Sequence, residues 1–589
     1  MKDKGRTRVV ALVVVAVFTG LGVRLAFLHV KPAASTLSRI ESGRHLEVET
    51  RGPRGRILDR NGHILGVDIS ARHVCADPKF MMEQKVDLSK TCDLLSEHLS
   101  MNRRDVWKLL DQPERQYVRI RKYMREKATE PLRAMKIKGL IFEEVPIRNY
   151  PKGVLGAHVI GFANHEGVGS AGIEQKMNSY LQGTAGRLVS LKDGRRREIY
   201  SRRTVHDEPQ PGADVYLTID QQVQHFAEKA LDDLVSNYEP QGAWAIVQNV
   251  RTGEILAMAS WPTFDPNRFG SAPAEWIRNR VIGYTYEPGS VMKAMVIASA
   301  LDAGAVGTQD VFDCENGRWV YGGKALHDSH GEGLLSVADI LKKSSNIGAA
   351  KIALNMGNEK VYQGLKDFGF GSPTGLDLPG EEGGILWNPK RWSKISATRL
   401  AMGHEINVTS MQMISALSAI ANGGVRMRPL IIRRVVDANG ETIFEPLPEE
   451  LGRPIRPETA VEMRRLLARV TQPGGTGTKA ALQGYLVAGK TGTAQKVNLE
   501  EGGYYPDKYI ASFAGFLPVE NPAISIMVVV DDPQGAHYGG TVCAPAFRAI
   551  ADQTVRYLRI SPQGLPTEYI SELETLSLKE ENVRENHAK

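Results

Sequence analysis

The chain has 589 residues, of which 42% are hydrophobic and 24% charged, and its formal net charge is +7. This length exceeds what one ordinary hydrophobic core needs, so two or more domains are expected in a chain of ordinary globular composition. The positive charge is modest and interspersed with acidic residues, which argues against nucleic-acid binding. The four cysteines form no CxxC pair, which argues against a zinc or redox site and leaves disulfide pairing open.

The first thirty residues predict a membrane anchor. Four basic residues between positions 2 and 8 precede an apolar stretch at residues 9–23, which continues beyond Arg24 as residues 25–30. These runs give roughly 20 apolar residues, enough to cross a bilayer as one helix. The basic cluster favours a cytoplasmic N-terminus, with everything after Lys31 outside the membrane. A cleaved signal peptide is the alternative, but its apolar core would be shorter and residues 31–35 match a cleavage site poorly.

Residues 33–236 predict an irregular, mostly β first domain. They are charged, with short apolar runs broken by Gly and Pro. The arginine-rich stretch at residues 194–197 is typical of solvated surface. A helical pattern follows at residues 222–237.

Strand-like runs lie on both sides of a helical region in the second half of the chain. Residues 243–250 and 255–260 flank a Gly-containing turn and predict a hairpin, and residues 509–516 and 523–530 predict a second strand pair. The segments between them predict helices, among them residues 347–356 and 410–421. Strands at both ends and helices between them indicate an α+β fold with a sheet packed against a helical lobe. From residue 561 the chain becomes polar and predicts a disordered tail.

The segment Tyr-Glu-Pro-Gly-Ser-Val-Met-Lys, residues 286–293, is the first candidate for catalytic chemistry. Ser290 lies at a predicted helix start, and Lys293 lies one turn later on the same face. A serine becomes nucleophilic when a neighbouring base takes its proton, and a buried lysine beside other cations can be that base. The helix N-terminus also favours an oxyanion. Ser290 is the only serine in the chain with Lys three residues later, although a serine there also fits a plain helix cap.

Two further motifs strengthen this interpretation. Ser344-Ser345-Asn346 falls between two predicted helices, where a polar turn is the simpler interpretation. Lys490-Thr491-Gly492-Thr493 follows a strand-like run and contains the only Lys-Thr-Gly of the chain. The S-x-x-K, S-x-N and K-T-G set is a signature of penicillin-binding proteins and β-lactamases, and here all three occur in the order that the mechanism requires.

Three other patterns are weaker. Residues 484–491 match a nucleotide P-loop formally, but Tyr, Leu and Val fill the loop and a strand is expected to continue, so a P-loop is rejected. Residues 475–478, Gly-Thr-Gly-Thr, lack a preceding Lys and predict a loop. Residues 327–330, His-Asp-Ser-His, lie in a Gly-rich stretch without a third metal ligand, which favours a structural or substrate-lining role.

With these motifs in place, the chain resembles the class B penicillin-binding proteins over nearly its whole length, especially their septal branch. Further segments resemble the pedestal domain of that family, its junction with the catalytic domain, the first catalytic hairpin and the lead into the last helix: residues 54–62, 148–151, 158–161, 172–174, 217–220, 252–258 and 538–547.

The resemblance implies a transpeptidase domain of the penicillin-binding and β-lactamase type, with an antiparallel sheet and a helical lobe, an elongated, mostly β N-terminal pedestal and one transmembrane helix. The implied organisation is a cytoplasmic tail (1–8), a transmembrane anchor (9–30), a pedestal for dimerisation or partner binding (31–235), a transpeptidase domain (236–560) and a disordered tail (561–589). The location implied is the bacterial cytoplasmic membrane, crossed once, with the catalytic domain on the extracytoplasmic side.

The resemblance also implies residue roles in the acylation step. Ser290 would attack the penultimate D-alanine carbonyl of a peptidoglycan stem peptide, and Lys293 would accept its proton. Ser344 and Lys490 would relay a proton toward the departing D-alanine. An amine from a neighbouring stem peptide would then take the acyl group. β-Lactam antibiotics mimic the donor and would acylate Ser290.

Substrate binding is assigned by the same resemblance. Asn346 would hold a substrate amide, and Thr491, Gly492 and Thr493 form the predicted substrate-binding strand, with the two threonines on the terminal carboxylate. Backbone N–H groups of Ser290 and Thr493 would form the oxyanion hole. No metal and no cofactor is expected.

The expected protein partner is a polytopic glycosyltransferase of the shape-elongation-division-sporulation class, contacted through the anchor and pedestal. Glu287 before Pro288-Gly289 and a pedestal with few insertions favour the septal enzyme over the elongation type, which stays open as the alternative. A membrane β-lactam sensor is less favoured, because only residues 1–8 precede the anchor. Hydrolysis, as in a carboxypeptidase or a β-lactamase, also stays open.

Overall fold

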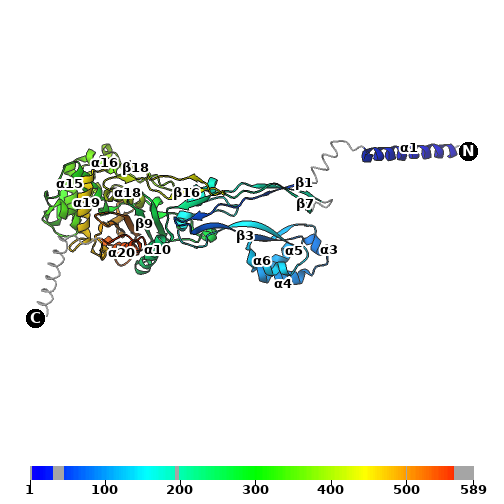
Figure 1. Ribbon diagram of the computed structural model, residues 1–589, viewed down its shortest axis with the longest axis horizontal. Helices are drawn as coiled ribbons and strands as arrows, with labels where there is room; N and C mark the ends of the chain where they lie inside the picture. Colours follow the sequence, from blue (N-terminus) through cyan, green and yellow to red (C-terminus); the bar gives the residue numbers. More distant parts are fainter. Residues whose placement is uncertain (1–2, 31–44, 193–197, 499, 563–589) are drawn as a thin grey trace. The chain divides into compact units, whose positions relative to one another are not determined.

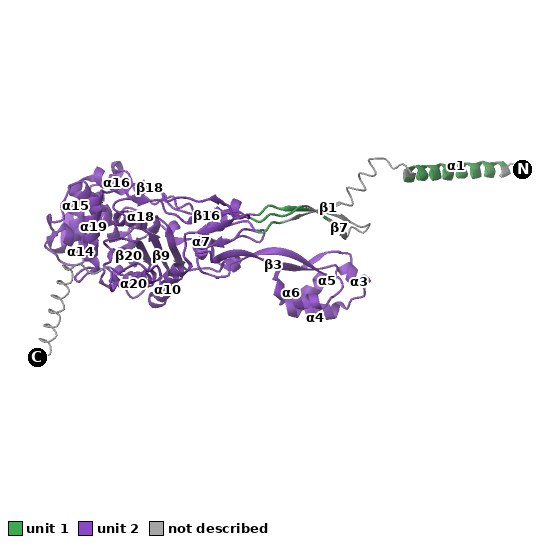
Figure 2. Ribbon diagram, in the orientation of Figure 1, with its two compact units in different colours: residues 1–53, 183–212 green, residues 54–182, 213–589 purple. Residues whose placement is uncertain are grey.

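The computed structural model describes residues 3–30, 45–192, 198–498 and 500–562. The chain divides into two compact units, residues 1–53 with 183–212 and residues 54–182 with 213–589 (Figure 2). Two predictions fall outside the described residues: the solvated arginine-rich stretch at 194–197 and nearly all of the disordered tail, from residue 563 onward.

The first unit contains the predicted membrane anchor. Helix α1 (Asp3–Val30) includes a 23-residue stretch, Gly5–Phe27, with a mean hydropathy of 2.4. Its apolar side chains, Phe18 and Val23 among them, are exposed. An exposed apolar helix of this length fits a single-pass membrane anchor.

The first unit also contains a three-stranded antiparallel sheet in the order β1-β6-β7. Its strands are β1 (His45–Thr50), β6 (Gly186–Lys192) and β7 (Glu198–Asp207). Strand β1, which precedes residues 54–182 of the second unit in sequence, thus pairs with β6, which follows them, and β7 pairs with β6.

A seven-stranded sheet of the second unit combines strands from distant parts of the sequence (Figure 1). Its main path is β17-β16-β8-β2-β3-β4, and β5 pairs with β3. β2 and β8 are parallel, and the other pairs are antiparallel. The bounds are β2 (Ile57–Leu58), β3 (Ile64–Ala76), β4 (Val118–Arg125), β5 (Leu140–Asn149), β8 (Asp214–Leu217), β16 (Ile432–Val436) and β17 (Thr442–Phe444).

Four helices pack beside the far end of β3 and form a small lobe with its own core (Figure 1). They are α3 (Pro78–Glu83), α4 (Leu88–Leu99), α5 (Arg103–Leu110) and α6 (Glu126–Ala134). The first three begin at Asp77, Asp87 and Asn102, whose side chains accept backbone N–H groups of the first turn. Helix α4 buries Thr91, Cys92, Leu95 and Leu99, the spacing of one helical face. This helical lobe was not predicted, because residues 33–236 were expected to be mostly β.

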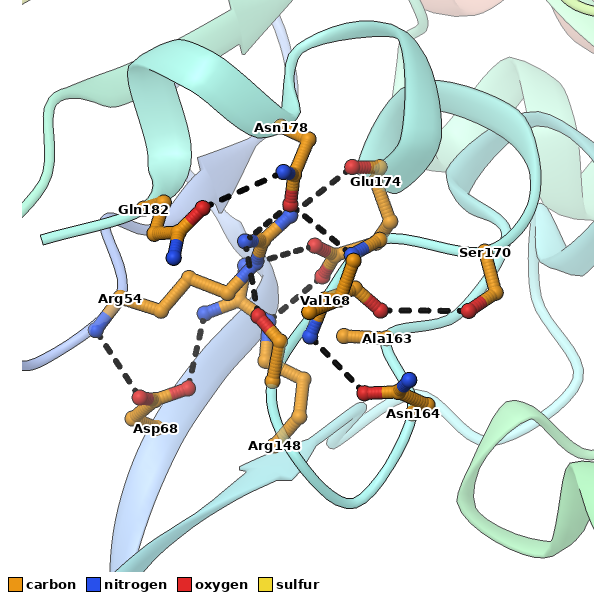
Figure 3. A network of polar contacts seen from close by, with 12 residues as sticks. Arg54, Asp68, Arg148, Ala163, Asn164, Val168, Ser170, Glu174, Asn178 and Gln182 are labelled. Carbon is orange, nitrogen blue, oxygen red and sulfur yellow. Dashed lines mark hydrogen bonds and ion pairs between the residues drawn. The ribbon is translucent and has the colours of Figure 1, made fainter. Parts of the chain in front are cut away.

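A buried polar network joins the segment before β2 to β3, to β5 and to two of the short helices that follow β5 (Figure 3). Arg54 Nε donates to Glu174 Oε2 over 2.6 Å, and Arg148 Nε donates to Glu174 Oε1 over 2.5 Å. Asp68 accepts from Arg148 over 3.2 Å, and Arg54 also donates to Asn178 Oδ1 over 2.8 Å. Three short helices frame the network: α7 (Ala157–Ile160), α8 (Gly172–Lys176) and α9 (Asn178–Leu181).

A five-stranded antiparallel sheet, β10-β9-β21-β20-β19, forms the centre of the second unit. Its strands are β9 (Gly242–Asn249), β10 (Ile255–Trp261), β19 (Ala488–Val497), β20 (Tyr504–Leu517) and β21 (Ile524–Asp531). The β9–β10 hairpin and the β20–β21 pair are the two strand pairs that the sequence predicts.

Helices cover both faces of this sheet, which explains why its central strands are apolar throughout. Ala243, Ala245 and Val247 of β9 belong to the core beneath α10 (Gln221–Tyr238) and α20 (Gly539–Tyr557). Trp244 and Ile246 point into the core of the opposite face, with α13 (Lys293–Asp302) and α18 (Ser410–Ala421). This alternation is the period of two expected for a strand.

The remaining helices form the lobe on the side of α13 and α18, and they confirm the predicted α+β architecture. Helix α18 ends at Ala421, before Asn422-Gly423-Gly424, as the sequence predicts. The other helices are α11 (Ala274–Ile277), α12 (Arg280–Gly283), α14 (Val337–Lys343), α15 (Asn346–Met356), α16 (Asn358–Asp367), α17 (Ser396–Ala401) and α19 (Pro457–Ala468). This part of the chain also contains three two-stranded sheets: β11 (Val311–Asp313) with β14 (Leu334–Ser336), β12 (Arg318–Tyr321) with β13 (Lys324–His327), and β15 (Arg426–Met427) with β18 (Glu450–Gly452).

Candidate active site

Ser290 lies in a 3₁₀ turn, η2 (Gly289–Met292), that leads directly into helix α13. Gly289 has φ +57°, a left-handed conformation that favours glycine. Val291 and Met292 are fully buried, whereas Ser290 remains partly accessible. The buried neighbours therefore anchor the turn and leave its hydroxyl at a surface, as predicted for a helix start.

Lys293 lies one turn later, and its side chain is fully buried. Its Nζ lies 3.0 Å from Ser290 Oγ, 2.5 Å from Ser344 O and 2.7 Å from Asn346 Oδ1. Burial lowers the pKa of Lys293 from its ordinary 10.5 to about 7, and the charge of Asp328 opposes this only in part. An amine with this pKa can exchange a proton with the adjacent hydroxyl near neutral pH.

Ser344 occupies the short link between α14 and α15. It has φ +63°, and its Oγ lies 3.2 Å from Lys293 Nζ and 2.8 Å from Lys490 Nζ. Asn346 is the first residue of α15. The link therefore places one hydroxyl between two lysine amines, beside the amide of Asn346.

Asp328 holds this link in place. Its carboxylate accepts the backbone N–H groups of Asn346 and of Ile347, the latter over 3.0 Å, and the hydroxyl of Ser345 over 2.6 Å. A carboxylate at a helix N-terminus caps the free N–H groups and complements the helix dipole. The His-Asp-Ser-His segment thus has a structural role through Asp328, one of the two roles that the sequence analysis favoured over a metal site.

Lys490 lies on β19 with its side chain fully buried. Besides Ser344 Oγ, its Nζ contacts Thr491 O over 3.2 Å and Thr491 Oγ1 over 3.4 Å. Burial, together with the charge of Lys293, holds the pKa of Lys490 well below its ordinary value. Lys490 belongs to an edge strand of the sheet. The residues that match a P-loop formally therefore do not form a phosphate-binding loop.

Gly492 lets β19 pass close to the turn that carries Ser290. A Cβ at this position would lie 2.3 Å from Ser512 Oγ and 2.9 Å from Pro288 O. Thr493, next along the strand, accepts the backbone N–H of Gly539 through its Oγ1 over 3.2 Å. The Lys-Thr-Gly-Thr strand is thereby held between the serine turn and the start of α20.

A cleft of about 480 Å³ contains Ser290, Ser344, Asn346, Thr491 and Thr493 in its lining. Lys293, Lys490 and Gly492 lie beneath this lining, fully buried or nearly so. The structure therefore brings together all eight residues that the sequence analysis selected.

Several lining residues were not selected from the sequence. Thr476 belongs to the Gly-Thr-Gly-Thr loop that the sequence analysis set aside, and its Oγ1 lies 2.8 Å from Thr491 Oγ1. Gly-rich polar loops are common, so only the fold shows that this loop reaches the cleft. Ser329 and His330 also line the cleft, and they belong to the segment for which the sequence favoured a structural or substrate-lining role. The other unselected lining residues are Lys343, Met402, His404, Thr478, Lys479, Tyr538, Gly539, Gly540 and Thr541.

The four cysteines, Cys75, Cys92, Cys314 and Cys543, are buried and free, which answers the question that the sequence left open. Within the described residues, no three His, Cys, Asp or Glu side chains gather as a metal site would require.

Two family models match the chain. Residues 243–552 match the penicillin binding protein transpeptidase domain, and residues 49–217 match the penicillin-binding protein dimerisation domain.

Among similar proteins, stage V sporulation protein D of Bacillus subtilis is 34% identical over 559 residues, 93% of this chain and 85% of that protein. Peptidoglycan D,D-transpeptidase FtsI of Escherichia coli is 33% identical over 528 residues, 87% of this chain and 85% of that protein. Penicillin binding protein 3 of Mycobacterium tuberculosis, solved in complex with aztreonam, superposes with a TM-score of 0.69 at 28% identity, covering 88% of this chain and 98% of that chain.

Proposed function

This chain belongs to the class B penicillin-binding proteins, and on that premise we propose that it cross-links septal peptidoglycan through an acyl-enzyme at Ser290. Both domain matches and the similarity to two relatives over most of their length establish the family. The chain is thus a serine-type peptidoglycan D,D-transpeptidase. The single observation that carries the residue assignment is the chain of contacts from Ser290 through Lys293 and Ser344 to Lys490.

In the first half-reaction, Ser290 Oγ attacks the penultimate D-alanine carbonyl of a donor stem peptide, and its proton passes to Lys293. The 3.0 Å distance between Ser290 Oγ and Lys293 Nζ supports direct transfer. A pKa of about 7 makes a large fraction of Lys293 neutral near physiological pH. The amide of Asn346, 2.7 Å from the same Nζ, keeps the amine oriented.

The departing D-alanine needs a proton on its nitrogen. Ser344 Oγ lies between the two lysines, 3.2 Å from Lys293 and 2.8 Å from Lys490, so it can pass a proton from one side to the other. The burial of both amines supports this relay, because it weakens their hold on protons.

The rest of the cleft suits a peptide that ends in a carboxylate. Hydroxyls of Thr491 and Thr493 line the cleft and can donate to that carboxylate, and hydrogen bonds to a charged group are the stronger kind. Backbone N–H groups of Ser290 and Thr493 are proposed to stabilise the oxyanion. β-Lactams are expected to enter as donor mimics, which the complex of the Mycobacterium tuberculosis protein with aztreonam supports.

We further propose that α1 anchors the chain in the bacterial cytoplasmic membrane with residues 1–8 in the cytoplasm. The basic residues before the apolar stretch support this orientation. In this arrangement residues 31–235 form the pedestal and residues 236–560 the extracytoplasmic transpeptidase domain. A polytopic glycosyltransferase of the shape-elongation-division-sporulation class is the proposed partner, which would supply the glycan strands.

The septal role is the finer part of the proposal, with elongation as its alternative. Glu287, directly before Pro288-Gly289-Ser290, is the residue that favours the septal branch. A fluorescent fusion to the full chain is expected to concentrate at midcell in dividing cells. Uniform signal along the side wall would instead assign the chain to elongation.

The acyl-enzyme is tested with a fluorescent penicillin and the full-length protein in detergent. Ser290→Ala is expected to abolish covalent labelling, because it removes the hydroxyl that lies 3.0 Å from Lys293 Nζ in the turn that leads into α13. Intact-protein mass and mapping of the adduct locate the label in the unmodified chain. A Ser290→Ala protein that unfolds cooperatively like the wild type but still takes up the label would exclude Ser290 as the nucleophile.

A further inference from the structure

A second set of titratable groups adjoins the serine turn and takes no part in the contacts among Ser290 and the two lysines. The carboxylate of Glu287 is almost fully buried, with 9% of its side chain exposed. It accepts from the backbone N–H of Glu405 over 2.9 Å and from the hydroxyl of Tyr504 over 3.0 Å. Its Oε2 also lies 2.7 Å from Nδ1 of His404.

His404 is held beside the nucleophile by backbone contacts. The N–H of Gly289 donates to the carbonyl of Gly403 over 3.3 Å, and Tyr286 and Val408 exchange backbone hydrogen bonds of 3.0 and 2.9 Å. A Cβ on Gly403 would lie 2.1 Å from Gly289 O, so the two segments touch. His404 therefore follows a residue in direct backbone contact with the turn of Ser290.

One edge of the His404 ring is free. Its side chain is 23% exposed, and the residue lines the same cleft as Ser290 and Thr493. Glu287 occupies Nδ1, and no hydrogen bond joins Nε2 to another part of the chain that the structure describes. A carboxylate on Nδ1 sets the tautomer and leaves Nε2 as a proton acceptor, the arrangement of a histidine that acts as a general base.

The second half-reaction needs such a group. An acceptor amine is an ammonium near neutral pH, so it must lose one proton before it can attack the acyl-enzyme and a second as the amide forms. Lys293 can carry only the second, which it returns to Ser290 Oγ as that oxygen leaves, so another base must take the proton that the ammonium loses first. We propose that His404 Nε2 accepts this proton and that Glu287 is its positioning residue. The proposal rests on the acyl-enzyme at Ser290.

The step balances as follows. The nitrogen of the acceptor amine forms a bond to the acyl carbon, and the bond between that carbon and Ser290 Oγ breaks. The ammonium first loses one proton to His404 Nε2, and its nitrogen then loses a second proton to Lys293 Nζ, which passes it to Ser290 Oγ. The products are the amide cross-link and the free serine, and His404 later loses its proton to solvent.

The two half-reactions can be separated in the full-length protein. A synthetic D-alanyl thioester acylates the enzyme, and D-alanine serves as the acceptor amine. In His404→Ala, the rate of acylation by penicillin is expected to stay within about threefold of wild type, whereas aminolysis at saturating D-alanine falls about 100-fold. Free imidazole is expected to restore aminolysis about tenfold in this variant and to leave the wild type unchanged.

Two further variants sharpen the test. Glu287→Gln keeps the size of the side chain but removes its charge, and it is expected to lower saturated aminolysis without raising the half-saturating D-alanine concentration. His225→Ala, an exposed histidine on α10, is the matched control and is expected to retain both rates.

Three results would overturn the proposal. Unchanged aminolysis in His404→Ala, or a change only in the half-saturating D-alanine concentration, would exclude proton transfer. Loss of penicillin labelling in His404→Ala, with normal labelling of the wild type at Ser290, would show that the residue supports acylation instead. Failure of the wild type itself to label at Ser290 would refute the acyl-enzyme. This outcome is distinguishable from the other two, because both require that the wild type is labelled normally.

Discussion

Two clusters of buried cations in the second unit differ in how their charge is balanced. Lys293 and Lys490 are fully buried and contact hydroxyl, carbonyl and amide groups, and neither forms an ion pair with a described carboxylate. Arg54 and Arg148 are also buried, but Glu174 and Asp68 compensate both (Figure 3).

The difference follows from what each cation can do. A lysine that is buried without a counter-ion can lose its proton, and the lowered pKa of Lys293 reflects this. A guanidinium stays charged, so burial is tolerated only with carboxylates in contact. Uncompensated burial thus creates a base in one cluster, and compensated burial creates a rigid joint in the other.

Lys293→Arg should have the largest effect, because it makes the cation of the first cluster permanent. We expect the rate of acylation by penicillin to fall by about 10⁴-fold, since an arginine cannot accept the serine proton. Stopped-flow or gel-based labelling measures the rate, and circular dichroism confirms the fold. Acylation within tenfold of the wild type would remove Lys293 from the role of base.

Glu174→Gln removes the shared counter-ion of the second cluster. Two buried guanidinium groups then retain only Asp68, so the free energy of unfolding should fall by about 3–5 kcal/mol. Urea denaturation of the full-length protein measures this change. Glu144→Gln, on an exposed carboxylate whose contact is with Ser70, is the control and should change it by less than about 1 kcal/mol.

Arg54→Lys keeps the positive charge of the second cluster but removes the planar guanidinium group with its several N–H donors. Arg54 donates four side-chain hydrogen bonds, to Glu174 Oε2, Glu174 O, Gly167 O and Asn178 Oδ1. A lysine cannot reach all of them, so we expect a loss of about 2 kcal/mol in the same denaturation experiment. An unchanged free energy of unfolding would mean that charge alone holds the joint.

The pH dependence of acylation should be the mildest probe of the first cluster. With a pKa of about 7, Lys293 is mostly neutral at pH 8 and mostly charged at pH 6, so the acylation rate should fall about tenfold from pH 8 to pH 6.

The free energy of unfolding should also decrease as the pH falls. Between pH 10.5 and about 7 the unfolded chain binds more protons than the native one, so the free energy of unfolding decreases as the pH falls. Lys293→Met should show a shallower decrease, and an unaltered slope would contradict the lowered pKa.

The catalytic motifs could be predicted from the sequence because each is a short local pattern with its own chemistry. Ser290 with Lys293, and Lys490 through Thr493, carry their residue types and their helix or strand context within a few positions. The strands on either side of the helical region also follow from local periodicity, and the structure confirms them.

The rest of the site depends on contacts that no local pattern records. Asp328 caps helix α15, although it lies well before that helix in the sequence. Thr476 contacts Thr491 only because the loop that carries it folds back against strand β19. His404 gains its partner, Glu287, only when two distant segments pair. The lobe of α3 to α6 was missed for a different reason, because its helices are only 6 to 12 residues long and charged residues are interspersed among the apolar ones, which obscures their spacing.

The mixed sheet of the second unit has a practical consequence for recombinant work. Strand β16 borders β8 through the register Ile432↔Leu217 to Val436↔Asp214. A truncated protein that begins at residue 236 would lose β8 and expose the edge of β16 as an unpaired strand, a template for aggregation. Shortened proteins for crystallisation or inhibitor screening should therefore keep residues 54–217 together with the catalytic part.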